Sequence, residues 1–253
     1  MQNIRIIPRL DIKGTNLVKG IHLEGLRVVG KPEETAQKYY QDGADEILFI
    51  DIVASLYGRN NLLELIRSTV QNVFIPLTVG GGIRNVNDIR NILRAGADKV
   101  AINTAVVNNP SLITEAAETF GSQCVVVSIE TIKTGQNRWE IFTENGREKT
   151  GIDALEWAER VCDLGAGEIL LTSIDREGTK KGYEIDLVRS LAKRVPIPVI
   201  ACGGAGNPKH VRQIILEGSC DAVSMASVLH YDLYGMAEIK AYLQASDIPV
   251  RQT

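Results

Sequence analysis

The chain has 253 residues, of which 44% are hydrophobic and 23% charged, and its formal net charge is -3 at pH 7. This composition allows a sizeable apolar core, and the length is typical of one eight-stranded α/β barrel. The slight negative charge argues against nonspecific binding to nucleic acid or to an anionic membrane, because both need a basic surface. The chain has neither a signal-peptide pattern nor an apolar run of about 20 residues, so we expect a cytoplasmic protein.

Short runs rich in Ile, Val and Leu alternate with longer amphipathic stretches, which is typical of repeated βα units around a parallel sheet. The predicted strands cover residues 4–10, 46–51, 76–79, 99–103, 124–129, 168–172, 198–201 and 222–225. The predicted helices cover residues 31–41, 61–71, 85–94, 110–120, 153–164, 184–193, 209–217 and 235–244. Units that follow one another without a linker predict a single (βα)8 barrel rather than an open sheet, which would have edges to protect.

A glycine-rich segment occurs twice in the chain. It reads IPLTVGGGIRN at residues 75–85 and IPVIACGGAGN at residues 197–207. Residues 43–52 align with residues 165–174 at the same offset. Because the identities stay in register across several units, the sequence predicts two half-barrel repeats, covering about residues 1–122 and 123–253.

Two predicted connections are longer than a tight βα loop requires. Residues 13–31 contain four glycines together with Lys19, and long glycine-bearing loops at the catalytic end of a barrel often act as lids. Residues 131–150 contain the pair Asn145-Gly146 between extended segments. Asn-Gly in that position predicts a β-hairpin.

The carboxyl ends of the strands are where the active site of such a barrel lies. Asp11 and Glu130 follow the first and the fifth predicted strands, which face each other across the barrel mouth. The pair suits one carboxylic acid and one carboxylate acting as general acid and base. The alternative is that they are ordinary acidic residues at exposed strand ends.

The glycine turns predict two anion sites, because backbone N–H groups and a following helix can approach an anion there. The first site combines Gly82 with Asn103 and Thr104. The second combines Gly204 with Ala226 and Ser227, and the flexible segment around Gly178 lies beside it. A tight turn alone can also demand glycine. Two related copies nevertheless predict a ligand with a phosphate at each end.

Charged residues also occur at the opposite ends of the strands, where a barrel interior should be apolar. They are Arg5, Glu46, Lys99 and Glu168. One interpretation is a ring of ion pairs that plugs the bottom of the barrel, since buried charges are normally paired. The other is a gated passage.

Metal and cofactor sites are not predicted. The three histidines, His22, His210 and His230, lack ligand spacing, and the glycine turns lack the GxGxxG spacing of a nicotinamide site. We therefore expect neither a metal nor a cofactor.

Six segments carry a resemblance to a known family: residues 5–13, 76–83, 97–103, 120–123, 165–176 and 201–206. They resemble the cyclase subunit of imidazole glycerol phosphate synthase, and the match covers almost the whole chain. The resemblance implies a (βα)8 barrel that uses ammonia to cleave and cyclise a bisphosphorylated ribulosyl formimino-carboxamide ribotide in histidine biosynthesis. It also implies a heterodimer with a glutaminase that docks on the amino-terminal face and sends ammonia through the barrel.

The same resemblance implies roles for individual residues. Asp11 and Glu130 would be catalytic, and Lys19 would contact the substrate from the mobile first loop. One phosphate site would comprise Gly82, Asn103 and Thr104, and the other Gly178, Gly204, Ala226 and Ser227. The ammonia gate would comprise Arg5, Glu46, Lys99 and Glu168.

Three residues depart from the family pattern. Arg9 stands where a small residue is usual, and Glu130 and Glu177 stand where aspartate is usual. Two alternatives therefore accompany the histidine-pathway interpretation. The chain could be a paralogue that supplies ammonia for amidation of a nucleotide-linked sugar in surface polysaccharide biosynthesis, or a non-catalytic scaffold that activates a glutaminase.

Overall fold

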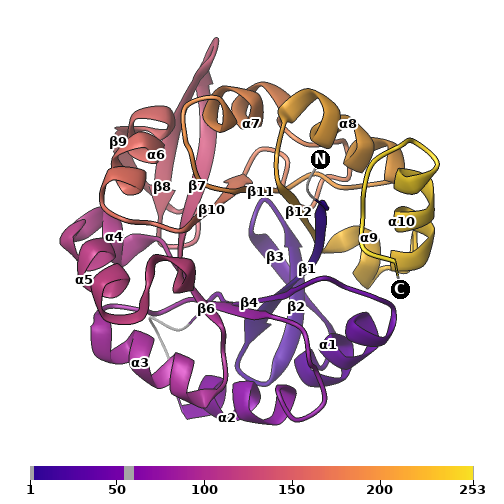
Figure 1. Cartoon of the computed structure of the whole chain (residues 1–253), viewed down its shortest axis with the longest axis horizontal. Coiled ribbons are helices and arrows are strands. Elements are labelled where there is room, and N and C mark those ends of the chain that lie inside the picture. The colour runs from indigo at the N-terminus through magenta and orange to yellow at the C-terminus, as the bar shows by residue number, and fades with distance from the viewer. Residues whose placement is uncertain (1–2, 54–59, 253) are drawn as a thin grey trace.

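A computed structural model of the chain describes residues 3–53 and 60–252. Within these residues, eight parallel strands form a closed barrel (Figure 1). The barrel strands are β1 (Arg5–Lys13), β4 (Ile47–Asp51), β5 (Leu77–Gly80), β6 (Lys99–Ile102), β7 (Val125–Gly135), β10 (Glu168–Ser173), β11 (Val199–Cys202) and β12 (Ala222–Met225). Because β1 pairs with both β12 and β4, and β7 pairs with β10, the predicted (βα)8 barrel is confirmed.

The helices form an outer ring around the barrel (Figure 1). The long ones are α1 (Pro32–Gln41), α2 (Asn60–Thr69), α3 (Val86–Ala95), α5 (Ser111–Phe120), α6 (Ala154–Asp163), α7 (Ile185–Ala192), α8 (Pro208–Gly218) and α10 (Met236–Gln244). Each corresponds to a predicted helix. The sequence did not predict two short helices, α4 (Thr104–Asn108) and α9 (Ser227–His230), or the 3-10 turn η1 (Ser122–Cys124).

The core lies in two layers, because successive strand residues point to opposite faces of the sheet. On β1, Ile6 and Leu10 pack between the sheet and the helices. Ile7 packs in the barrel interior with Leu48 and residues of other strands. Residues 9 and 11 fall on the same side of β1 as Ile7, so their side chains enter the upper interior of the barrel.

Two antiparallel extensions interrupt the βα pattern. β1 continues into β2 (Asn16–Ile21) and β3 (Glu24–Gly30), and β7 continues into β8 (Arg138–Thr143) and β9 (Glu148–Asp153). The predicted Asn-Gly hairpin is confirmed between β8 and β9. The first loop, expected to be a lid, is a folded hairpin here; its movement stays a prediction.

Matched contacts in the two halves of the barrel support the predicted repeat. The side chain of Asn85 caps α3 by accepting from Asp88 N, and that of Asn207 caps α8 by accepting from His210 N, both at 3.0 Å. A second matched pair joins Leu77 N to Asp98 at 2.8 Å and Val199 N to Asp221 at 2.9 Å. The repeat boundary near residue 122 stays a prediction.

The cysteines are free thiols, with Cys202 and Cys220 buried and Cys124 and Cys162 half-buried. Among the helices of the described ranges, none combines the length and apolar character needed to cross a membrane.

Candidate active site at the barrel mouth

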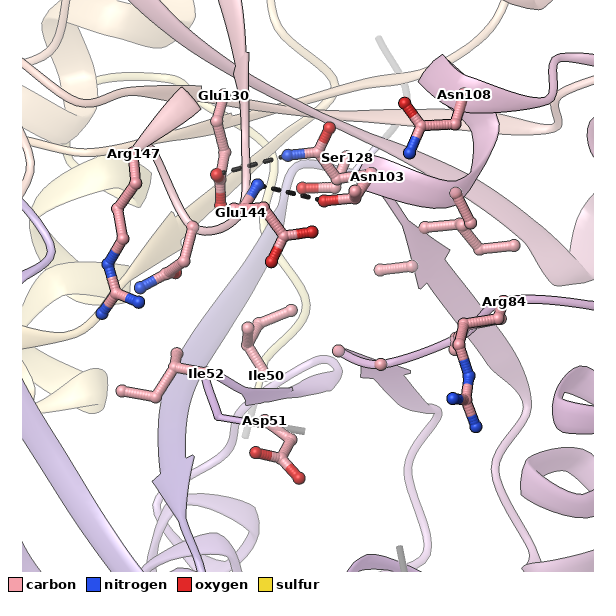
Figure 2. A pocket seen from close by; sticks show the side chains of 18 of the residues that line it. Ile50, Asp51, Ile52, Arg84, Asn103, Asn108, Ser128, Glu130, Glu144 and Arg147 are labelled. Carbon is pink, nitrogen blue, oxygen red and sulfur yellow. Dashed lines mark hydrogen bonds between the residues drawn. The ribbon is translucent and has the colours of Figure 1, made fainter. Parts of the chain in front are cut away.

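A cavity of about 450 Å³ opens at the carboxyl ends of β4, β5, β6 and β7. Figure 2 shows side chains that line it, including those of Asn103 and Glu130. Gly82 and Thr104 also line the cavity. The structure therefore brings the whole first predicted phosphate site together with one of the two predicted catalytic acids.

The first glycine turn has a backbone that favours glycine. Gly81 and Gly82 follow β5 with φ angles of 100° and 63°, a left-handed region that L side chains rarely adopt. A Cβ atom at Gly81 would also collide with the backbone carbonyl of Asp51. The turn thus needs its glycines for its shape as well as for any approach of an anion.

Glu130 lies at the wall of the cavity and is almost completely buried. Its Oε2 accepts a hydrogen bond from Asn103 Nδ2 at 3.2 Å (Figure 2). The same nitrogen donates to the backbone oxygen of Phe142 at 3.1 Å. Burial raises the pKa of Glu130 to about 7; the Arg9 charge opposes this rise and the Asp11 charge adds to it. A carboxyl group with this pKa can both give and take a proton near neutral pH.

Asp11 lies in a different environment. Its side chain is buried in the barrel mouth, where Arg9 Nε donates to Oδ1 at 2.7 Å and Lys19 Nζ donates to Oδ2 at 3.0 Å. Burial alone would raise the pKa of this carboxyl, but the Arg9 and Lys19 charges hold it well below its usual range. Asp11 is therefore a carboxylate, and it does not line the large cavity that contains Glu130.

Lys19 reaches Asp11 from the hairpin formed by β2 and β3. Its ammonium group also pairs with Glu177, in the loop after β10. The backbone of His22 donates to Glu177 O at 3.0 Å, and His22 Nδ1 lies 2.8 Å from Ile174 O. These contacts fasten the hairpin against the second half of the barrel mouth.

The second predicted phosphate site lies beneath this hairpin. Gly178, Gly204, Ala226 and Ser227 line one small pocket of about 10 Å³, which is room for about one water molecule. A Cβ atom at Gly178 would lie 2.5 Å from the backbone oxygen of Gly20. The predicted residues are therefore brought together, but the hairpin leaves little space between them.

The charged residues at the amino-terminal end of the barrel form a closed ring of ion pairs. Arg5 and Lys99 each contact Glu46 at 2.9 Å, Lys99 contacts Glu168 at 3.0 Å, and Arg5 pairs with Glu168 as well. The two glutamates are buried, whereas the two cations are partly exposed. The predicted pairing is confirmed, and the function as a gate stays a prediction.

Sequence reasoning missed three charged residues of the large cavity, Arg84, Glu144 and Arg147 (Figure 2). Arg84 follows the first glycine turn, and Arg147 follows the Asn-Gly turn. The positions of these two arginines directly after predicted turns are the sequence feature that could have indicated them. Both guanidinium groups add positive charge that suits a phosphate.

Comparison with known proteins assigns the family. The model of the histidine biosynthesis protein family matches residues 5–234. The chain belongs to this family. A relative from Legionella pneumophila, the imidazole glycerol phosphate synthase subunit HisF, is 62% identical over 206 residues, which cover 81% of this chain and 97% of the relative. The resemblance predicted from the sequence is confirmed, and the family match spans every residue of the candidate site.

Proposed function

We propose that this chain is the cyclase subunit of an imidazole glycerol phosphate synthase. It would use ammonia to convert a bisphosphorylated formimino-carboxamide ribotide into imidazole glycerol phosphate and an aminoimidazole carboxamide ribotide. One observation carries the proposal: two acids whose surroundings shift their pKa values in opposite directions lie at the barrel mouth between two glycine turns. They lie there in a chain that is 62% identical to a HisF subunit.

The two acids would have different tasks. Glu130, with a pKa near 7, would donate and accept protons during cleavage and ring closure. Asp11, which remains ionised, would stabilise positive charge that develops as ammonia adds to the substrate. Pairs of acids whose environments separate their pKa values commonly divide acid and base work in this way.

The two phosphates would bind at opposite sides of the mouth. The first would lie in the large cavity against Gly82 and Thr104, with Arg84 and Arg147 supplying charge. The second would need the hairpin to move away from Gly178, because the pocket there has room for only about one water molecule. That movement would release Lys19 from Glu177 and let its ammonium group contact the substrate.

The partner would be a glutaminase, forming a heterodimer at the amino-terminal face of the barrel. The ion-pair ring opens toward this face through the partly exposed Arg5 and Lys99. Phe74 also lies at the amino end of a barrel strand, with 74% of its surface exposed, and its ring packs edge-on against Tyr40. An exposed aromatic residue at the same end of the barrel as the ion-pair ring suits a docking surface. We propose the cytoplasm as the compartment of the complex.

The test is turnover of the bisphosphorylated substrate by the purified chain with an ammonium salt. We expect turnover by the wild type and a loss of at least about a hundredfold in Asp11→Asn, because removal of a group used in the transition state lowers kcat. Asp186→Asn, an exposed change on α7, is the matched control and should leave kcat unchanged.

Each alternative predicts a different outcome. Substrate binding without turnover would exclude the cyclase and favour the sugar-amidation paralogue. A scaffold would leave every measurable activity, including activation of a glutaminase, unchanged in Asp11→Asn.

A further inference from the structure

Arg9 is a buried cation inside the barrel, at a position where the resemblance led us to expect a small residue. Only 1% of its surface is exposed. Its Nε donates to Asp11 at 2.7 Å, whereas Nη1 makes longer contacts, 3.4 Å to Thr172 Oγ1 and 3.6 Å to Cys202 Sγ. Nη2 has no hydrogen-bond partner in the part of the chain that the structure describes. The one short contact of the guanidinium is therefore the contact with Asp11.

The two oxygens of Asp11 are held by cations of different kinds. Arg9 belongs to the same barrel strand as Asp11, two residues away, and is fixed by the sheet. Lys19 belongs to the hairpin and divides its ammonium group between Asp11 and Glu177. If the hairpin moves, the cation at Oδ2 leaves with it, while the cation at Oδ1 stays.

We infer that Arg9 is a positioning residue that keeps Asp11 in its carboxylate form, so that Glu130 is the member of the acid pair that exchanges protons with the substrate. The inference rests on the proposed function for the identity of the reaction. It concerns residues of this chain alone, so it can be tested without substrate.

Several charged or titratable groups surround Asp11 and the two cations that bond to it. They are Arg9 on β1, Lys19 on β2, Glu130 on β7, Glu177 in the loop after β10, Cys202 on β11 and His230 on α9. Arg9 and Lys19 are the cations among them that bond to the carboxylate. Without Arg9, a departure of Lys19 would leave Asp11 buried and uncompensated, and a buried carboxyl in that condition takes up a proton.

Arg9 also acts on the second acid. Its charge opposes the burial that raises the pKa of Glu130, and the result is a pKa of about 7. One guanidinium thus lowers the pKa of both acids, and it bonds directly to Asp11. An uncharged residue that only filled the space of Arg9 would not lower the pKa of either acid in this way.

The test compares Arg9→Met, which keeps the bulk and removes the charge, with Arg9→Lys, which keeps the charge. Lysine has no donor at the position of Nε, and its ammonium nitrogen lies about where Cζ of Arg9 does, so Arg9→Lys keeps the charge beside Asp11 without the Nε hydrogen bond. The carboxyl carbons of Asp11 and Glu130 are followed by 13C NMR across pH 3 to 9 in the full-length chain. Arg194→Met, on the surface, is the control.

The wild-type Asp11 carboxyl should keep its ionised chemical shift across this pH range, and in Arg9→Met a midpoint should move toward or into the range from the acid side, because loss of one adjacent opposite charge raises the pKa of a carboxyl group by about 1 to 3 units. The midpoint of Glu130 should rise in the same direction. Arg9→Lys should return both midpoints toward those of the wild type, and Arg194→Met should move neither. The kcat profile should shift with them, and Arg9→Met should acquire a new loss of activity on the acid side.

Unchanged midpoints in Arg9→Met, with reduced thermal stability alone, would overturn the inference and make Arg9 a space-filling residue. If Arg9→Met does not fold, as judged by circular dichroism, Arg9→Gln provides the uncharged comparison with Arg9→Lys. Shifted midpoints in a protein that does not turn over the bisphosphate would support the role of Arg9 and refute the proposed function, so the two failures are distinguishable.

Discussion

Shortening Glu130 by one methylene group tests whether the cavity is built around glutamate. In the structure, its carboxylate accepts from Asn103 Nδ2 at 3.2 Å and from the backbone of Gly146. Aspartate would withdraw the carboxyl group by about 1.5 Å, which is the length of one carbon–carbon bond. The contact with Asn103, already 3.2 Å long, would then exceed hydrogen-bonding distance. The family's usual aspartate would therefore be poorly positioned in this chain.

The expected cost follows from that displacement. A catalytic group misplaced by about 1 Å loses about a hundredfold in rate, which corresponds to about 2.7 kcal/mol of activation free energy. We expect Glu130→Asp to lower kcat by about this factor. KM should change little, because the glycine turns that would bind the phosphates are untouched.

The assay is steady-state turnover of the bisphosphate with saturating ammonium salt. Glu156→Asp, an exposed change of the same chemistry on α6, is the control and should retain the wild-type kcat. A kcat that rises in Glu130→Asp would refute the reasoning. It would mean that the site is shaped for aspartate and that Glu130 lowers its activity.

Three further predictions concern stability, measured as the free energy of unfolding in urea. Gly204 has a φ angle of 107°, so Gly204→Ala should cost about 1 to 3 kcal/mol; an unchanged midpoint would contradict the strain. Lys99→Met leaves Glu46 and Glu168 with Arg5 as their shared partner and should cost about 3 kcal/mol, whereas an equally stable variant would show that the ring is solvated. Burial lowers the pKa of His230 to about 4, so its unfolded form binds more protons between pH 6.5 and 4. Relative to His230→Phe, the free energy of unfolding of the wild type should therefore fall by about 1.4 kcal/mol for each pH unit of acidification through that window. Equal pH dependences of the unfolding free energy in the two proteins would refute this.

The barrel and the two turns were predictable because local rules determine them. Alternation of apolar runs with amphipathic stretches locates the strands to within a residue or two, except where β1 and β7 run on into their hairpins. The asparagines that cap α3 and α8 follow directly from the spacing of the repeated segment. The positions of Asp11 and Glu130 at the barrel mouth follow from their places directly after the predicted first and fifth strands.

The network around Asp11 was not predictable, because it depends on how a hairpin folds back. The turn of that hairpin uses His22 and Leu23 at positive φ angles of 53° and 65°, a conformation that no glycine or proline rule predicts there. The pairing of Lys19 with Glu177 joins residues 158 positions apart. The short helices α4 and α9, of five and four residues, cover too little of a helical period to be recognised.

The two ends of the described chain meet at the amino-terminal side of the barrel. Ile4 pairs with Val250 in a parallel bridge, and Ile4 N donates to Pro249 O at 2.8 Å. Arg251 Nε, at the same corner, donates to Asp45 at 2.9 Å. The barrel itself closes through the pairing of β1 with β12, and the Ile4–Val250 bridge joins the segment before β1 to the segment after α10. A variant that began near residue 123, with residues 252 and 3 joined by a linker, would keep every strand pairing of the barrel, so we expect it to reach the same fold.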